Sequence, residues 1–113
     1  MNRAETTHND CAQIVEAKLP AVQALCRQFG VRRLDLFGSA ATGRFDPERS
    51  DLDFLVEFEN PPSGGFSGGY FKLLAALETL FQRKVDLVNE RSLVNPYRRR
   101  RIESEKRTLY QAP

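Results

Sequence analysis

The feature that most constrains this chain is the run from Asp51 to Phe58, in which every second residue is apolar and the intervening positions are Asp51, Asp53, Leu55 and Glu57. Its apolar members share one face of an extended strand: Leu52, Phe54, Val56 and Phe58. The other face carries Asp51 and Asp53, whose backbone positions lie roughly 6.5–7 Å apart along such a strand. Two neighbouring carboxylates repel each other, and Asp is disfavoured in strands. A divalent cation held by oxygen ligands is the usual reason for such a pair.

A third carboxylate, Asp86, stands in the middle of the apolar run Val85–Val88. If this run is a strand beside the Asp51–Phe58 strand, with Val85 and Leu87 in the core, Asp86 faces the same way as the first two carboxylates. Three carboxylates on adjacent strands can hold two Mg²⁺ ions, which together activate an attacking oxygen and stabilise a leaving phosphate.

The dipeptide Gly38-Ser39 ends another predicted strand, Val31 to Phe37. A strand that turns into a helical start at such a point leaves backbone N–H groups free, which favours anions. Gly38 allows a phosphate to approach the backbone closely, and Ser39 adds a hydroxyl donor. Phosphates at the turn and metal ions on the next strand together predict a site for a nucleoside triphosphate.

The remaining periodicity predicts helices and one more strand. Apolar residues recur at helical spacing over residues 10–29, with Pro20 either kinking one helix or opening a second. A short helical turn is expected over 40–44 and a loop over 45–50. An amphipathic helix is expected over 70–83, with a stripe that includes Phe71 and Leu77, followed by a strand over 84–88. A last helix over about 96–106 has Asn95 as its cap.

These elements predict an α/β (α+β) fold, in which helices back one face of a small mixed sheet. The chain of 113 residues is expected to form a flexible N-terminus over 1–9 and a single domain over 10–113. Residues 60–69 are rich in Pro and Gly and predict a flexible surface loop.

Composition narrows the class of protein further. No apolar run approaches the ~20 residues that span a bilayer, so no membrane contact is expected. The first ten residues lack the apolar core of a signal peptide, so a cytoplasmic protein is the expectation. The net charge of +2 conceals an acidic centre over 44–59 and a basic segment over 97–107.

The segment from Leu36 to Val56, with Gly38-Ser39, a short helix and then Asp51-x-Asp53 on a strand, resembles the signature of the DNA polymerase β nucleotidyltransferase superfamily. The short chain is similar to its minimal nucleotidyltransferase (MNT) branch. The resemblance implies that Gly38 and Ser39 contact the triphosphate of ATP, and that two Mg²⁺ ions are bound by three carboxylates: Asp51, Asp53 and Asp86. The same resemblance makes Asp86 the group that assists deprotonation of the acceptor. We also assign Ser50 to nucleotide binding.

One residue departs from the pattern of the branch. Many minimal members have Arg in the turn that follows Gly-Ser, and this chain has Thr42 there. Arg44 or Arg49 are candidate replacements for that cation.

MNT proteins resemble the antitoxins of HEPN/MNT toxin–antitoxin pairs, which transfer AMP from ATP to a Tyr hydroxyl of the HEPN toxin. The resemblance implies that this chain is such an antitoxin, an Mg²⁺-dependent protein adenylyltransferase with a HEPN partner. Two alternatives stay open: an antitoxin that neutralises by binding alone, and a nucleotidyltransferase that acts on a small molecule or an RNA 3′ end.

Two charged features outside the motif have alternative interpretations. Asp35 lies near Arg32 and Arg33, which predicts a surface ion pair. The run Arg98–Arg101 spreads around a helix, so residues 95–110 are expected to face a protein partner, with RNA as the competing target.

Overall fold

The structure, a computed structural model, describes residues 10–42, 51–59 and 68–113. Helices and strands follow one another in this order: α2 (Asp10–Ala17), α3 (Leu19–Gln28), β1 (Val31–Phe37), α4 (Ser39–Thr42), β2 (Leu52–Phe58), α5 (Gly68–Phe81), β3 (Val85–Asn89), the 3₁₀ helix η1 (Glu90–Ser92), α6 (Pro96–Glu105) and β4 (Arg107–Gln111). No helix in these described ranges is long and apolar enough to cross a membrane.

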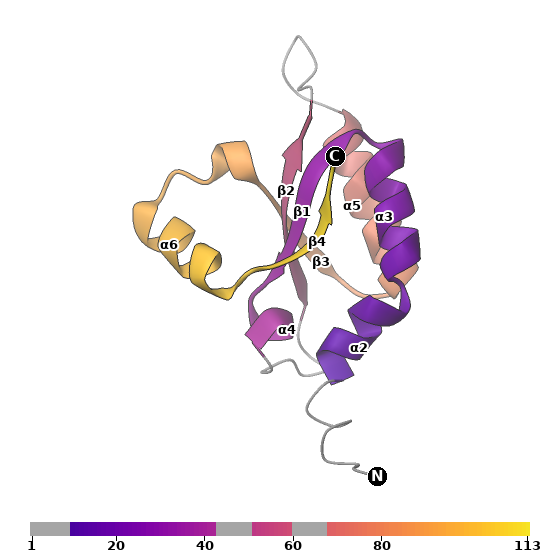
Figure 1. Ribbon diagram of the computed structural model, residues 1–113, viewed down its shortest axis with the longest axis horizontal. Helices are drawn as coiled ribbons and strands as arrows, with labels where there is room; N and C mark the ends of the chain where they lie inside the picture. Colours follow the sequence, from indigo (N-terminus) through magenta and orange to yellow (C-terminus); the bar gives the residue numbers. More distant parts are fainter. Residues whose placement is uncertain (1–9, 43–50, 60–67) are drawn as a thin grey trace.

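Four strands form one mixed sheet in the order β3-β2-β1-β4 (Figure 1). β1 pairs antiparallel with both β2 and β4, whereas β2 pairs parallel with β3. A parallel pair needs a crossover connection, which α5 provides. The predicted α+β class with a small mixed sheet is therefore confirmed.

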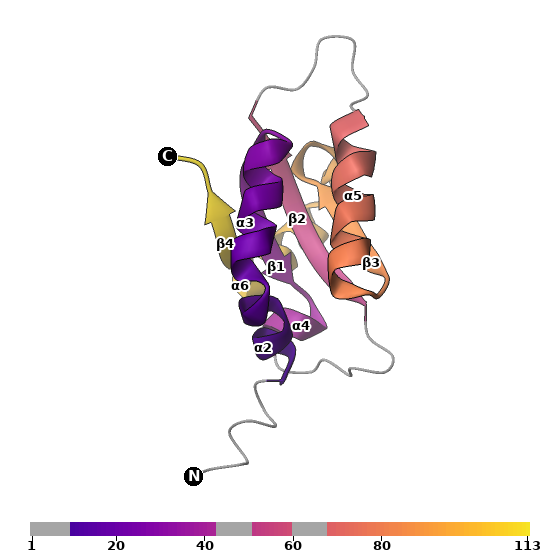
Figure 2. The same cartoon turned by 90° about the vertical axis from the view of Figure 1, so that its right-hand side faces the viewer.

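Helices α3 and α5 lie side by side on one face of the sheet (Figure 2). The main core fills the space between them and the strands, and its fully buried members include Val22, Cys26, Leu34, Phe54, Leu73 and Leu77. Pro20 lies in the first turn of α3, so it opens a second helix rather than kinking one. Phe71 is 55% exposed. The prediction that it joins the core stripe is wrong, because the buried face of α5 centres on Leu73 and Leu77.

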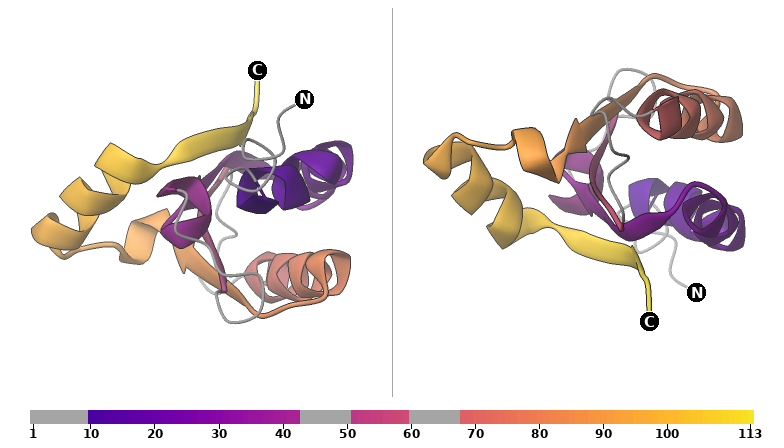
Figure 3. Two further views of the ribbon diagram at one scale, coloured as in Figure 1. Left: turned by 90° about the horizontal axis from the view of Figure 1, so that it is seen from below. Right: turned by 90° about the horizontal axis from the view of Figure 1, so that it is seen from above.

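Helix α6 lies on the opposite face of the sheet, which makes the fold three-layered (Figure 3). A second, smaller core holds it there, formed by Phe37, Leu55, Leu93 and Ile102. The expectation that helices back only one face is therefore wrong. A single buried side chain of α6, Ile102, carries the contact, and one apolar residue is too weak a pattern to assign a helix to a face.

Strand β4 was not predicted from the sequence. It pairs with β1 at the edge of the sheet, where its side chains are half-buried or exposed. Edge strands of this kind lack the clear alternation that marks a strand packed on a core. The side chain of Gln23 on α3 donates a hydrogen bond to the Leu109 carbonyl, which ties this strand to the helix layer.

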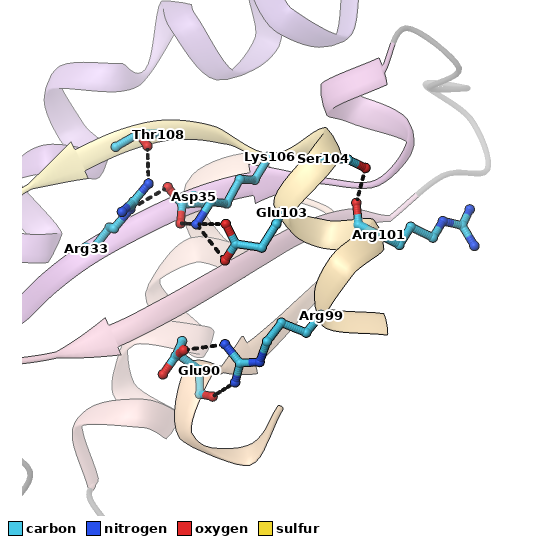
Figure 4. A network of polar contacts seen from close by, with 9 residues as sticks. All are labelled: Arg33, Asp35, Glu90, Arg99, Arg101, Glu103, Ser104, Lys106 and Thr108. Atoms are coloured by element: carbon cyan, nitrogen blue, oxygen red, sulfur yellow. Dashed lines mark hydrogen bonds and ion pairs between the residues drawn. The ribbon is translucent and has the colours of Figure 1, made fainter. Parts of the chain in front are cut away.

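Asp35 forms the predicted ion pair with Arg33, but only 1% of the surface of Asp35 is exposed, so the prediction that this pair lies on the surface is wrong. Its carboxylate accepts a hydrogen bond from Arg33 Nε at 3.1 Å and lies 3.7 Å from Lys106 Nζ (Figure 4). Lys106 caps the end of α6, and Arg33 also donates to the Thr108 hydroxyl of β4. This charge cluster fastens α6 and β4 to the central strand.

Three sequence-based predictions lie wholly or partly outside the described residues. They concern the flexible N-terminus over 1–9, the loop over 45–50 and most of the loop over 60–69. Gly68 and Gly69 are described, and they begin α5 instead of ending the predicted loop.

Asp35→Ala should destabilise the fold by about 2–4 kcal/mol, because it leaves two cations near the sheet without their shared anion. Chemical denaturation followed by circular dichroism measures this change. Glu57→Ala is the matched control, since Glu57 pairs with Arg32 at 4.0 Å on an exposed surface, where the expected cost is below about 1 kcal/mol. Equal costs for the two variants would contradict the anchoring role of Asp35.

Candidate active site

The pairing register places two predicted site residues, Asp53 and Asp86, in one row across the sheet with Phe37. Phe37 at the end of β1 lies opposite Asp53 of β2, and Asp53 lies opposite Asp86 of β3. Leu52 and Phe54, the neighbours of Asp53, point into the main core. The carboxylates of Asp53 and Asp86 therefore belong to the other face, on the same side as α6.

The turn after β1 contacts this row. Gly38 has a φ of +74°, a left-handed conformation that Gly adopts without strain. A Cβ at this position would lie 2.2 Å from Asp53 Oδ2, so any residue larger than Gly would clash with the Asp53 carboxylate. Two N–H groups of α4, those of Ala41 and Thr42, donate to the Gly38 carbonyl at 3.1 and 3.2 Å. The backbone of the turn at Gly38 thus packs directly against the Asp53 carboxylate.

These groups line one hollow of about 400 Å³ between the sheet end and α6. Its lining residues are Phe37, Gly38, Ser39, Asp53, Asp86, Arg98, Arg101, Ile102 and Glu105. We call this hollow the cleft. A larger hollow of about 630 Å³ lies between α3 and α5, but its lining of Ala, Leu and Thr residues contains no ionisable side chain. The cleft, which is lined by ionisable side chains, is therefore the candidate active site.

The structure brings together four of the six residues predicted for the site: Gly38, Ser39, Asp53 and Asp86. Asp51 is exposed and lies one position before β2, outside the lining of the cleft. Ser50 lies outside the described residues, as do Arg44 and Arg49.

The electrostatics of Asp53 reflect its neighbours. The pKa of this carboxyl is raised from its ordinary value of 3.8 to about 6, chiefly by burial and then by the charges of Asp86 and Asp51. Arg98 opposes the shift, and Glu105 adds to it slightly. Burial and the neighbouring negative charges therefore destabilise the ionised carboxylate of Asp53, and a bound cation would stabilise it.

The donor set fits Mg²⁺ bound together with phosphates. Carboxylate oxygens are the ligands that Mg²⁺ prefers, and it is usually held by one or two carboxylates together with substrate phosphates and water. Asp53 and Asp86 line the cleft, and Asp51, outside this lining, is near enough for its charge to raise the pKa of Asp53. In the described part of the chain, no three acidic, His or Cys side chains form a ready metal cage. The protein would thus provide part of the coordination shell.

Sequence reasoning missed the contribution of α6 to this site. Arg98, Arg101 and Glu105 line the cleft at spacings of three and four, which put them on one face of the helix. That spacing is visible in the sequence. The position of the helix over the carboxylates is not, because it depends on the packing of Ile102.

Comparison with known proteins agrees with this geometry. The profile of the family described as "Nucleotidyltransferase domain" matches residues 21–109. A Methanocaldococcus jannaschii protein, provisionally named a protein adenylyltransferase, is 38% identical over 78 residues, which cover 69% of this chain and 76% of that protein.

Solved structures show the same fold. One that is provisionally described as a minimal nucleotidyltransferase superposes with a TM-score of 0.68 at 38% identity, and the match covers 82% of this chain and 90% of the other. Another match lies in the complex of a tri-AMPylated Shewanella oneidensis HEPN toxin with its MNT antitoxin. It has a TM-score of 0.61 at 18% identity, covers 86% of this chain and 72% of the other, and carries information on the fold alone.

The raised pKa of Asp53 predicts a pH-dependent stability. Between its ordinary pKa of 3.8 and about 6, the folded protein binds more protons at Asp53 than the unfolded chain does, so stability falls as the pH rises through this window. Asp53→Asn removes this loss. Its melting temperature in EDTA should exceed that of the parent by an amount that grows up to a pH of about 6 and then levels off.

Thermal melts at a series of pH values measure this difference. Glu59→Gln removes one negative charge at an exposed position just beyond β2, and it should not reproduce the pH-dependent gain. A gain of Asp53→Asn that is the same at every pH would contradict the assigned electrostatics.

Proposed function

This chain belongs to the nucleotidyltransferase domain family, and we propose that it is a protein adenylyltransferase that transfers AMP from ATP to a tyrosine hydroxyl of a HEPN-type toxin, as the antitoxin of that pair. One observation carries the proposal. The Gly38-Ser39 turn and the Asp53–Asp86 pair, from three different elements, line a single cleft. A turn open to phosphates beside acceptor-only carboxylates suits a metal-bound nucleoside triphosphate.

The names of the related proteins support the finer parts of the proposal. The Methanocaldococcus relative carries a protein adenylyltransferase name, which supports a protein as the acceptor of AMP. The Shewanella complex pairs an MNT protein with an AMPylated HEPN toxin, which supports a HEPN protein as the partner.

Each residue of the cleft has a role in the proposed transfer. Gly38 presents its backbone to the triphosphate without a side chain, and the Ser39 hydroxyl donates to a phosphate oxygen. Asp51, Asp53 and Asp86 would hold two Mg²⁺ ions, and Ser50 would contribute to nucleotide binding. Mg²⁺ neutralises phosphate charge and lowers the pKa of a coordinated hydroxyl.

The proposed chemistry is an exchange at the α-phosphorus of ATP. The acceptor oxygen forms a bond to this phosphorus while the bond to the pyrophosphate oxygen breaks, so AMP is transferred and pyrophosphate leaves. Asp86 accepts the proton of the acceptor hydroxyl. Asp86 is more exposed than Asp53 and lies on β3, an edge strand of the sheet, which supports this role.

The direct test mixes the purified protein, Mg²⁺, ATP labelled at the α-phosphate and a HEPN-type protein encoded beside it. Label on a tyrosine of the HEPN protein is the expected result. Neutralisation of the toxin without label would favour an antitoxin that acts by binding. Label on RNA or on a small molecule would replace the proposed acceptor.

The double variant Asp51→Ala/Asp53→Ala should lose transfer by about 10³-fold or more, since metal binding contributes several kcal/mol and each 1.36 kcal/mol is worth tenfold. Its fold should persist, because two repelling charges are removed. The same labelling assay and circular dichroism check both points. Transfer at the parent rate would show that these carboxylates do not hold the metal.

Two glycines form a matched pair that separates backbone strain from a role in the site. Gly30 and Gly38 both have positive φ, at +70° and +74°, but a Cβ at Gly30 would meet nothing within 4 Å. Replacing either by Ala should cost about 1–2 kcal/mol of stability through backbone strain. Only Gly38→Ala should abolish AMP transfer, because its methyl group displaces the Asp53 carboxylate. Equal transfer rates for the two variants would refute the assignment of this turn.

A further inference from the structure

The four consecutive arginines of α6 have different surroundings. Arg98 and Arg101 line the cleft. Arg99 donates to Glu90 Oε2 at 2.7 Å and to the Leu93 carbonyl at 2.6 Å, so it is part of the scaffold. Arg100 is exposed and forms no ion pair with any of the described residues. The basic run is therefore divided into two residues that face the site, one that is structural and one that points away.

The helix that presents Arg98 and Arg101 is fixed at both ends and in its middle. At its start the Asn95 side chain accepts from the backbone N–H groups of Tyr97 and Arg98 at 2.9 and 3.2 Å. Ile102 is buried in the second core, and Lys106 at the far end lies by the Asp35 carboxylate. Figure 4 shows Arg99 and Lys106 reaching from this helix toward Glu90 and Asp35. The two cleft arginines thus extend from a rigid wall.

Without Arg98 and Arg101, the ionisable side chains that line the cleft would all be acidic. Asp53, Asp86 and Glu105 contribute negative charge to the lining. The turn, described as far as Thr42, contains no cationic side chain. The Thr42 hydroxyl donates back to the Gly38 carbonyl at 3.0 Å instead of facing a ligand. Among the described residues that line the cleft, Arg98 and Arg101 are the positively charged ones.

We propose that Arg98 and Arg101 bind the β- and γ-phosphates of the nucleotide and stabilise the pyrophosphate that leaves. This inference rests on the proposed function and specifies which residues of the chain recognise the triphosphate. A guanidinium group donates two parallel hydrogen bonds to a phosphate, which suits Arg better than Lys for this role. Glu105, which also lines the cleft, accepts a hydrogen bond from Arg101 Nε at 3.3 Å.

The test is a titration by calorimetry with an ATP analogue that has a methylene bridge between its α- and β-phosphorus, in the presence of Mg²⁺. This analogue cannot release AMP, so binding is measured apart from transfer. Arg98→Gln/Arg101→Gln should bind it about 10- to 100-fold more weakly, at roughly tenfold for each charge-assisted contact. Affinity for AMP, which lacks the β- and γ-phosphates, should change by less than about threefold on the same scale.

Arg100→Gln is the matched control, because it removes the same charge from the same helix outside the cleft. The affinity of Arg100→Gln for the analogue should stay within about twofold of the parent. Salt screens the interaction between an exposed charge outside the cleft and the bound phosphates. Arg98→Lys/Arg101→Lys keeps both charges and should bind about three- to tenfold more weakly through loss of the paired hydrogen bonds. This variant decides the question if the Gln variant does not fold.

The outcomes separate this inference from the proposed function. A parent protein that does not bind the analogue with Mg²⁺ would overturn the proposed function itself. A parent that binds, with Gln and Lys variants of unchanged affinity, would overturn only the role of the two arginines. An equal loss for AMP and the analogue, or an equal loss in Arg100→Gln, would also overturn it. Unchanged analogue binding with lost binding to the HEPN protein would assign the arginines to a partner surface.

Discussion

The register between β1, β2 and β3 is the constraint on which the site depends. It places Phe37, Asp53 and Asp86 in one row, with the Gly38 turn directly beyond it. Side chains alternate along a strand, so a slip of β2 by one residue would turn Asp53 into the main core and Leu52 and Phe54 out of it. The buried contacts of Phe54, which include the Phe81 ring at a centroid distance of 6.1 Å, oppose that slip. The packing of the core therefore also fixes the position of Asp53 in the site.

The second core holds α6 against the sheet, and the cleft lies between that helix and the end of the sheet. Four buried residues, Phe37, Leu55, Leu93 and Ile102, hold α6 over the end of the sheet. The helix then both encloses Asp53, which raises the pKa of that carboxyl, and supplies Arg98 to offset part of the repulsion. The folded protein accepts a costly buried charge at the point where a cation and phosphates are proposed to bind. Stability would thus be reduced at the proposed site, as is common where function needs a strained or repulsive arrangement.

Strong local patterns were enough to predict the central part of the site. The alternation over residues 52–58 identified the face that carries Asp53, and Gly38 marked the turn. Weak patterns failed where tertiary contacts decide the outcome. β4 is a half-exposed edge strand, Asp35 is buried only because Arg33 and Lys106 converge on it, and α6 is placed by one isoleucine. Which two of the four arginines line the cleft depends on the rotation of α6 about its own axis, which composition does not reveal.

The incomplete set of carboxylates has a consequence for how the proposed site works. Asp53 and Asp86 line the cleft and Asp51 lies outside its lining, so the proposed metal site leaves coordination positions that phosphate oxygens can fill. Metal and nucleotide would then bind jointly. The metal would offset the repulsion between Asp53 and Asp86, and the phosphate oxygens would complete the coordination shell of the metal. Arg98 and Arg101 would act from the other side of the cleft, because cations there offset charge on the bound phosphates. Under the proposal, recognition of a triphosphate is divided between the end of the sheet, whose carboxylates would hold the metal, and one helix, whose arginines would contact the phosphates.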